Sequence, residues 1–382
     1  MSIHNDVSRP VKKRFRGVEM RKKSLLVIWF TILGLAVASV LMFAACGDSS
    51  DTTTSTAGTP SSTAPTTAEQ VLIRVTTPVP GGDEFLTWAQ EGMDRFNART
   101  NGAYKMEIFP GGQLGPFPES LDAIRTGAIE AGLIPLAAFG GSVPEFGLVE
   151  LPFLFNNGEA AAYAMPSIQT VWDELSQAQA NQRTLGCVFV GTANFLSTKK
   201  PLKTLDDLKG VIIGVDAPPM VELVNAVGGS GLVVDFTEDY SSLQKGIIDA
   251  KTSAPQYIYI AKLYEVAKYY TVFHGISGMY SFTVNSDVYN KMPKDIQDAL
   301  SEELSATAAS ISARYVTKLY ELEPVLTDLG MEFYYLPAAE RDKWKALAYP
   351  GTLDALAKLG DVGSRVKQIT DEANAKYPYT QQ

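Results

Sequence analysis

Residues 233–255 combine the patterns of a strand, a short helix and a second strand, and this order constrains the fold most strongly. Residues 233–236 predict a buried strand, because three of the four are apolar. Thr237 is a good helix N-cap, Gly246 predicts the end of that helix, and Ile247 begins the second strand. Open α/β sheets bind ligands at the carboxyl ends of such strands. A unit that serves packing alone would show the same pattern.

The first part of the folded body repeats this alternation of strand and helix. Strands are predicted at residues 71–77, 104–109 and 131–135, and amphipathic helices at 83–100 and 118–126. This order predicts a doubly wound α/β sheet.

The charge of the chain is uneven along its length. The chain has 382 residues with 33 basic and 42 acidic side chains, and residues 1–45 hold eight of the basic and two of the acidic ones. Residues 46–382 therefore keep 25 basic and 40 acidic residues, a net charge of −15. A body this acidic repels nucleic acid and anionic membrane surfaces, so we expect no nucleic-acid partner.

The N-terminal residues 1–45 predict a lipoprotein signal peptide rather than part of the fold. A basic stretch is followed by the apolar run 24–45 and then by Cys46, which small residues precede. We expect Cys46 to be acylated after cleavage. The run is also long enough to remain as an uncleaved membrane anchor. Both alternatives place the body outside the cytoplasm, in the periplasm or on the outer face of the cytoplasmic membrane, attached to that membrane.

Residues 46–68 predict a flexible tether between the anchor and the body. Thirteen of the twenty-two residues from 47 to 68 are serine or threonine, a composition that cannot form a core. Cys187 is the only cysteine that remains in the body, so no internal disulfide can form there. We expect a buried thiol at this position.

Six segments of the chain follow one another in a recognisable order. They are P-G-G-Q-L-G (110–115), E-S-L-D-A-I-R-T-G (119–127), V-P-E-F-G-L-V-E-L-P-F-L-F (143–155), L-D-D-L-K-G (205–210), F-T-E-D-Y-S-S-L-Q-K-G-I-I-D-A (236–250) and Y-E-V-A-K-Y-Y-T-V-F-H (264–274). In this order they resemble the substrate-binding proteins of tripartite ATP-independent periplasmic (TRAP) transporters, the DctP-like family, and the resemblance covers about residues 70–300 of the chain.

The resemblance implies an α/β, two-domain fold of the periplasmic-binding-protein type, with crossing strands, a long connecting helix and a ligand cleft between the domains. Domain I would hold residues 69–190 and 280–318, and domain II residues 191–279 and 319–382. The connecting helix is expected at residues 293–329, with a possible interruption at a proline. Closure around the ligand would be a hinge motion.

The chain departs from the family where the family holds its ligand. Two family arginines that clamp a substrate carboxylate fall on Ala193 and Gly214, and a family asparagine falls on Ser253. The sequence contains no arginine between Arg183 and Arg314, so a shift of the alignment cannot restore the clamp. We therefore expect a ligand that is not a simple carboxylate.

Two hypotheses for the ligand follow. A neutral, polar or partly apolar ligand would need polar and aromatic contacts, whereas an acid could pair with Lys251. Lys251 could also point into solvent at the end of its strand. The candidate ligand-binding residues are Thr192, Asn194, Asp216, Phe236, Tyr240, Ser253, Tyr257, His274 and Pro135. Phe236 and Tyr240 would serve equally as core residues, and His274 as a hydrogen-bonded structural residue.

Function classes other than TRAP transport have weaker support. His274 is the only histidine of the body, which excludes a multi-histidine metal centre, and no catalytic motif of a hydrolase appears, so we expect no enzyme. We predict no cofactor and no metal, because the acidic residues do not form a calcium loop. An ABC-type binding protein is the other alternative. The resemblance implies the small and large TRAP membrane subunits as partners, besides a small-molecule ligand.

Overall fold

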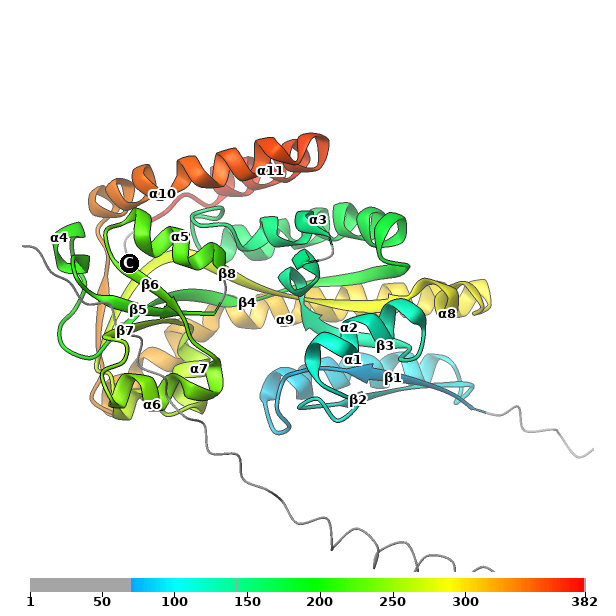
Figure 1. Cartoon of the computed structure of the whole chain (residues 1–382). Helices are drawn as coiled ribbons and strands as arrows, with labels where there is room; N and C mark the ends of the chain where they lie inside the picture. The colour runs from blue at the N-terminus through cyan, green and yellow to red at the C-terminus, as the bar shows by residue number, and fades with distance from the viewer. Residues whose placement is uncertain (1–69, 142, 217, 381–382) are drawn as a thin grey trace, which may run out of the picture. The chain divides into compact units, whose positions relative to one another are not determined.

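The computed structural model describes residues 70–141, 143–216 and 218–380 and contains one mixed sheet with helices on both faces (Figure 1). Within these residues the strand order is β2-β1-β3-β8-β4-β7-β5-β6, and β9 pairs with β8. The strands are β1 Val71–Thr76, β2 Tyr104–Phe109, β3 Ala131–Pro135, β4 Gln182–Ser197, β5 Ile212–Val215, β6 Ser230–Val233, β7 Ala250–Ser253, β8 Tyr269–Asn285 and β9 Glu332–Tyr335. The α-helices are α1 Glu84–Arg99, α2 Phe117–Thr126, α3 Gly158–Gln179, α4 Leu205–Leu208, α5 Pro218–Ala226, α6 Asp239–Gln244, α7 Pro255–Ile260, α8 Ser286–Asn290, α9 Lys294–Asp328, α10 Ala338–Lys358 and α11 Gly360–Lys376. The 3-10 helices are η1 Leu136–Gly141, η2 Pro144–Glu150, η3 Phe236–Glu238 and η4 Leu263–Glu265.

Two long antiparallel strands, β4 and β8, are shared by both halves of the sheet. Their pairing extends from Gln182 opposite Asn285 to Ser197 opposite Tyr269, with irregularities in the middle. The parallel strands β1–β3 continue the sheet at one end, and β5–β7 with β9 continue it at the other. Figure 1 shows the two groups at opposite ends of β4 and β8. The expected two-domain α/β fold with crossing strands is confirmed.

The hydrophobic core is divided in the same way. One cluster surrounds β1–β3 and includes Phe96 and Trp172, and we call this part domain I. Two clusters cover opposite faces of the sheet around β5 and β7, which we call domain II. Neighbouring residues of β4, Phe195 and Leu196, enter different clusters because successive side chains of a strand point to opposite faces. Helices α10 and α11 add Leu356 and other residues to the domain I cluster, and the exact domain boundaries stay a prediction.

The long helix α9 contacts α1, α3 and β4 in domain I and α7 in domain II, as expected of a connecting helix. It continues past Pro324 without interruption. It also lies unusually close to α1 and β4, which glycines permit. A Cβ atom at Gly92 would lie 1.9 Å from Thr307 Oγ1, and one at Gly186 would lie 2.8 Å from the Leu304 carbonyl oxygen.

The segment from Val233 onward differs from its predicted strand-helix-strand pattern. Strand β6 ends at Val233, whose side chain is 50% exposed, because β6 is an edge strand of the sheet. Phe236 belongs to η3 and not to a buried strand. Helix α6 starts after Glu238 rather than after Thr237, and β7 starts three residues beyond Ile247, which is exposed. The order of elements was correct, but their ends were not.

The predicted signal peptide, the tether and Cys46 lie outside the described residues. Within the described residues no helix combines the length and the apolar character that crossing a bilayer requires. Cys187 is buried, as expected.

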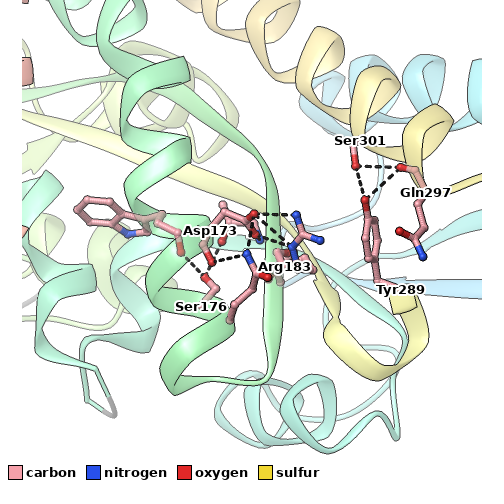
Figure 2. A network of polar contacts seen from close by, with 10 residues as sticks. Asp173, Ser176, Arg183, Tyr289, Gln297 and Ser301 are labelled. Atoms are coloured by element: carbon pink, nitrogen blue, oxygen red, sulfur yellow. Dashed lines mark hydrogen bonds and ion pairs between the residues drawn. The ribbon is translucent and has the colours of Figure 1, made fainter. Parts of the chain in front are cut away.

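A polar network fixes the start of β4 to α3 and lies near the beginning of α9 (Figure 2). Asp173 accepts hydrogen bonds from Arg183 Nε at 2.9 Å and Nη2 at 2.8 Å, and from the backbone N–H of Thr184 at 2.9 Å. The Arg183 guanidinium lies 4.5 Å from the centre of the Tyr289 ring, and the Tyr289 hydroxyl bonds Ser301 at 2.8 Å. Gln177 Nε2 also donates to Asp173 Oδ2 at 3.1 Å, so one carboxylate satisfies four donors at the point where β4 begins.

We expect Asp173→Ala to lower the free energy of unfolding by about 2–3 kcal/mol, because it leaves the Arg183 charge and the Thr184 N–H without their acceptor. Asp122→Ala is the matched control, since Asp122 pairs with Arg125 on the surface and its side chain is 76% exposed. The control should change stability by less than about 0.5 kcal/mol. Denaturant unfolding measures both values, and equal effects would contradict the role given to Asp173.

Candidate functional site

Several predicted site residues meet at the carboxyl ends of β5 and β7 in domain II. Asp216 directly follows β5, Ser253 is the last residue of β7, and Tyr257 lies on α7. β5 and β7 are neighbouring parallel strands, so their carboxyl ends share one edge of the sheet. All three are among the nine candidate residues, and their role in ligand binding stays a prediction.

Lys251 is the charged centre of this site. Its ammonium Nζ lies 2.6 Å from Asp216 Oδ1 and 3.0 Å from Asp239 Oδ1. The Lys251 side chain is 1% exposed and that of Asp239 is 0% exposed, whereas Asp216 remains 49% exposed. The alternative that Lys251 points into solvent is therefore wrong. Burial drives this ammonium into an ion pair with two carboxylates.

The side chain of Lys251 occupies space that an arginine side chain at position 214 would need. Gly214 pairs with Lys251 on the adjacent strand. A Cβ atom at Gly214 would lie 3.2 Å from Lys251 Cδ and 2.7 Å from Ile248 Cδ1. The absence of a side chain at 214 thus makes room for the buried lysine.

Asp239 is a site residue that the sequence did not suggest. The pKa of Asp239 is raised to about 6, because the effect of burial outweighs the lowering effects of Lys251 and of a hydrogen bond from Tyr257. Burial and the neighbouring carboxylates, Asp239 first, also raise the pKa of the Tyr257 hydroxyl. The cluster of Lys251, Asp216 and Asp239, which we call the ion triad, carries one excess negative charge when both carboxylates are ionised.

Domain I contributes Glu150, which ends η2 and accepts a hydrogen bond from the backbone N–H of Met279. The pKa of Glu150 is raised to about 7, mainly by burial and with a contribution from the charge of Asp216, which together outweigh the lowering effect of the Met279 N–H. Tyr280, which is opposite Pro135 in the sheet, has a raised pKa because of burial and the charges of Glu150, Asp83 and Asp216. Carboxylates from both domains therefore lie within electrostatic reach of one tyrosine.

Asn194 and its neighbours lie where the two long strands are irregular. Asn194 Oδ1 accepts hydrogen bonds from the backbone N–H groups of Phe273 at 2.9 Å and His274 at 2.7 Å, and Nδ2 donates to the Tyr270 hydroxyl at 3.0 Å. The side chain is 0% exposed, so Asn194 positions the strands. Thr192 Oγ1 lies 3.1 Å from His274 Nδ1.

His274 adopts a left-handed backbone conformation with φ of 49°, which is strained for a residue with a side chain. Burial and the charge of Arg341 lower the pKa of His274 to about 3, so its ring is neutral. A narrow pocket lies beside it, where elements of both domains meet α9. The residues that line it include Thr192, His274, Gln256, Gly158, Tyr315 and Tyr320.

The remaining predicted residues make contacts within domain II or lie at its edge. The Tyr240 hydroxyl donates to Glu265 Oε2 at 2.8 Å. Phe236 lies in η3. Ser253 is buried, and its carbonyl oxygen accepts from Tyr270 at 2.9 Å.

We expect Lys251→Met to lower the free energy of unfolding by about 3 kcal/mol at pH 8, because it leaves two carboxylates without their cation. The folded-state pKa of Asp239 is already raised, so its ionisation costs stability as pH rises from about 4 through 6. The loss should therefore be smaller at pH 5, where Asp239 takes up a proton.

The matched control is Lys199→Met, because Lys199 pairs with Asp249 while its side chain is 76% exposed. It should change stability by less than about 0.5 kcal/mol at either pH. Thermal unfolding at pH 5 and 8 measures both variants. A Lys251→Met effect that does not depend on pH would show that Asp239 is not the group left unpaired.

The sequence of this chain is similar to those of known solute-binding proteins. Residues 84–358 match the family model of the bacterial extracellular solute-binding proteins, family 7. The C4-dicarboxylate-binding periplasmic protein DctP of Rhodobacter capsulatus is 28% identical over 72% of this chain and 83% of its own length. The 2,3-diketo-L-gulonate-binding periplasmic protein of Escherichia coli is 26% identical over 60% of this chain and 69% of its own.

Solved structures show the same fold. A TRAP periplasmic solute-binding protein of Rhodobacter sphaeroides in an open apo form matches with a TM-score of 0.72 and 24% identity, over 80% of this chain and all of its own. One from Sulfitobacter with bound β-D-galacturonate matches with a TM-score of 0.68 and 20% identity, over 78% and 99% of the two chains. The family match covers well over half of the sequence, and the chain therefore belongs to the bacterial extracellular solute-binding proteins of family 7.

Proposed function

We propose that this chain is an extracytoplasmic receptor that captures a small organic solute by hinge closure and delivers it to the membrane subunits of a TRAP transporter. The observation that carries the proposal is the sharing of β4 and β8 by both domains, because two strands and α9 are the elements that a hinge would bend. Candidate ligand-contacting groups, Asp216 and Glu150, come from opposite sides of this hinge. Membership of the solute-binding family supports the same function.

The proposal includes the organisation of the chain. Residues 1–45 direct export, Cys46 carries the lipid, and residues 46–68 tether the body to the outer face of the membrane. Domain I comprises residues 69–190 and 280–318, and domain II comprises residues 191–279 and 319–382. The small and large TRAP membrane subunits would accept the loaded form.

We also propose that the ligand is not a simple carboxylate held by an arginine clamp. Related structures contain β-D-galacturonate, pyroglutamic acid or D-glucuronate, all of which are acids. In this chain Ala193 and Gly214 occupy the arginine positions. The alternative, an acid bound by Lys251, would require the ligand to displace Asp216 from the buried ammonium. That competition disfavours it.

A thermal-shift screen of the full chain against several hundred small metabolites tests the receptor function. Half of the compounds should be carboxylates and half neutral or cationic. Ligands that bind the native state raise the melting temperature with the logarithm of their concentration over Kd. We expect a small group of compounds to do so.

Small-angle X-ray scattering should then show that such a ligand lowers the radius of gyration, because closure brings the two domains together. A screen without any stabilising compound would contradict the receptor function. A stabilising compound that leaves the radius of gyration unchanged would contradict capture by hinge closure.

A further inference from the structure

The charges at the junction of the two domains are predominantly negative. Domain I contributes Asp83, the N-cap of α1, and Glu150. Domain II contributes Asp216 and Asp239, with Lys251 between them. All three of the carboxylates Asp83, Glu150 and Asp216 act on the hydroxyl of Tyr280, so they converge on one region.

The cations near this region are already paired. Lys251 is enclosed by two carboxylates and is 1% exposed. Lys318 on α9 is ion-paired to Glu84, and its distance to Glu321 is 3.7 Å. Among the described residues, neither lysine offers an unpaired charge to an incoming anion. Arg341, whose charge reaches His274, is 1% exposed and donates to backbone carbonyl oxygens, so it is enclosed as well. An anionic solute would therefore meet the field of the carboxylates without an exposed cation among these three residues to compensate for it.

Asp216 is the member of the ion triad that a solute can reach. Its side chain is 49% exposed, whereas Lys251 and Asp239 are enclosed. One carboxylate oxygen of Asp216 holds the Lys251 ammonium, and this bond fixes the orientation of the carboxyl group. Lys251 and Asp239 thus act as positioning residues for an exposed carboxylate at the carboxyl end of β5.

Glu150 makes closure sensitive to charge. It belongs to domain I, and its carboxyl group is within electrostatic range of Asp216 in domain II. Like charges that approach each other in a partly desolvated site repel. A hinge motion that brings the two carboxylates together is therefore opposed in the empty protein. A positive charge between them makes the electrostatic contribution to closure favourable instead.

Aromatic side chains complete the region. The ring of Phe85 lies 5.2 Å from that of Tyr280 and 6.0 Å from that of Tyr315, with both pairs edge to face. Tyr315 is 7% exposed and lines the narrow pocket beside β4. Aromatic faces next to carboxylates are the surroundings that attract organic cations.

We infer that the site selects a solute with a positively charged nitrogen, which Asp216 and Glu150 hold from opposite domains while Tyr280 and Tyr315 contact its carbon frame. The inference rests on the proposed receptor function and specifies its class of solute. Closure is then favoured by the ligand's own charge, because that charge lies between two carboxylates.

Matched triplets of equal size and different charge test this inference on the full chain. The probes are butane-1,4-diamine, butane-1,4-diol and succinate; choline, 3,3-dimethylbutan-1-ol and 3,3-dimethylbutanoate; and benzylamine, benzyl alcohol and benzoate. Calcium chloride is added as a separate arm. We expect a rise in melting temperature and calorimetric binding for cationic members only, at pH 8.

Asp216→Asn and Glu150→Gln should each weaken binding of the best cation tenfold or more, because each removes one charge of a pair. Asp206→Asn is the control, since Asp206 is an exposed partner of Lys209 with 83% of its side chain accessible. It should bind as the unaltered chain does. Circular dichroism verifies that the variants fold.

Binding confined to anions or neutral probes, or stabilisation by calcium alone, would overturn the inference and leave the receptor function intact. Unchanged affinity for the cation in both carboxylate variants would also overturn it. If no probe of any charge binds here while the metabolite screen identifies anions, the charge assignment fails. If that screen is empty as well, the receptor function fails with it.

Discussion

The antiparallel pairing of β4 with β8 is the constraint on which the rest of the structure depends. It holds both domains on one sheet, so a domain can turn only if these two strands bend. The register shifts between Phe189 and Thr192 and between Ala193 and Phe195 mark where regular pairing is interrupted. The side chain of Asn194 bridges this interruption by bonding two backbone N–H groups of β8.

Arg341 supports the same region from α10. Its guanidinium is 1% exposed and donates to the carbonyl oxygens of Phe273, Phe155 and Asn156 at 2.8, 3.3 and 3.2 Å. These carbonyls belong to β8 and to the segment before α3, so one side chain joins a shared strand to the entrance of a domain I helix. The low pKa of His274 follows from burial and from this neighbouring charge.

The charges of the proposed solute site follow from the residues that pair on two neighbouring strands, β5 and β7. A glycine at position 214 leaves space that the Lys251 stem and Ile248 fill, and the lysine then requires two carboxylates. The positive charge of the site is thereby neutralised inside domain II, and the exposed group that remains is the carboxylate of Asp216. Under the proposed function, the sheet of the family is retained while the charge offered to the solute differs.

The fold could be predicted further from the sequence than the site could. Helical periodicity located α1 and α9, and the spacing of the motifs gave the order of the elements. The burial of Val233 was mispredicted, because an edge strand and an inner strand of four residues look alike in a single sequence. Lys251 was considered as the partner of an acidic ligand or as a solvated charge, and its pairing with Asp239 was missed, since that pairing depends on a glycine on a strand distant in sequence.

A carboxyl-resolved NMR titration of the empty protein tests the central claim most directly, namely that the site presents converging carboxylates rather than a free cation. With carbon-13 labels in aspartate and glutamate side chains, Asp239 should titrate near pH 6 and Glu150 near pH 7. Replacement of Asp216 by asparagine should lower the pKa of Glu150, because one repelling charge is removed. If both groups titrate near 4, the ordinary range of exposed carboxyls, the carboxylates neither are buried nor converge, and the account is contradicted.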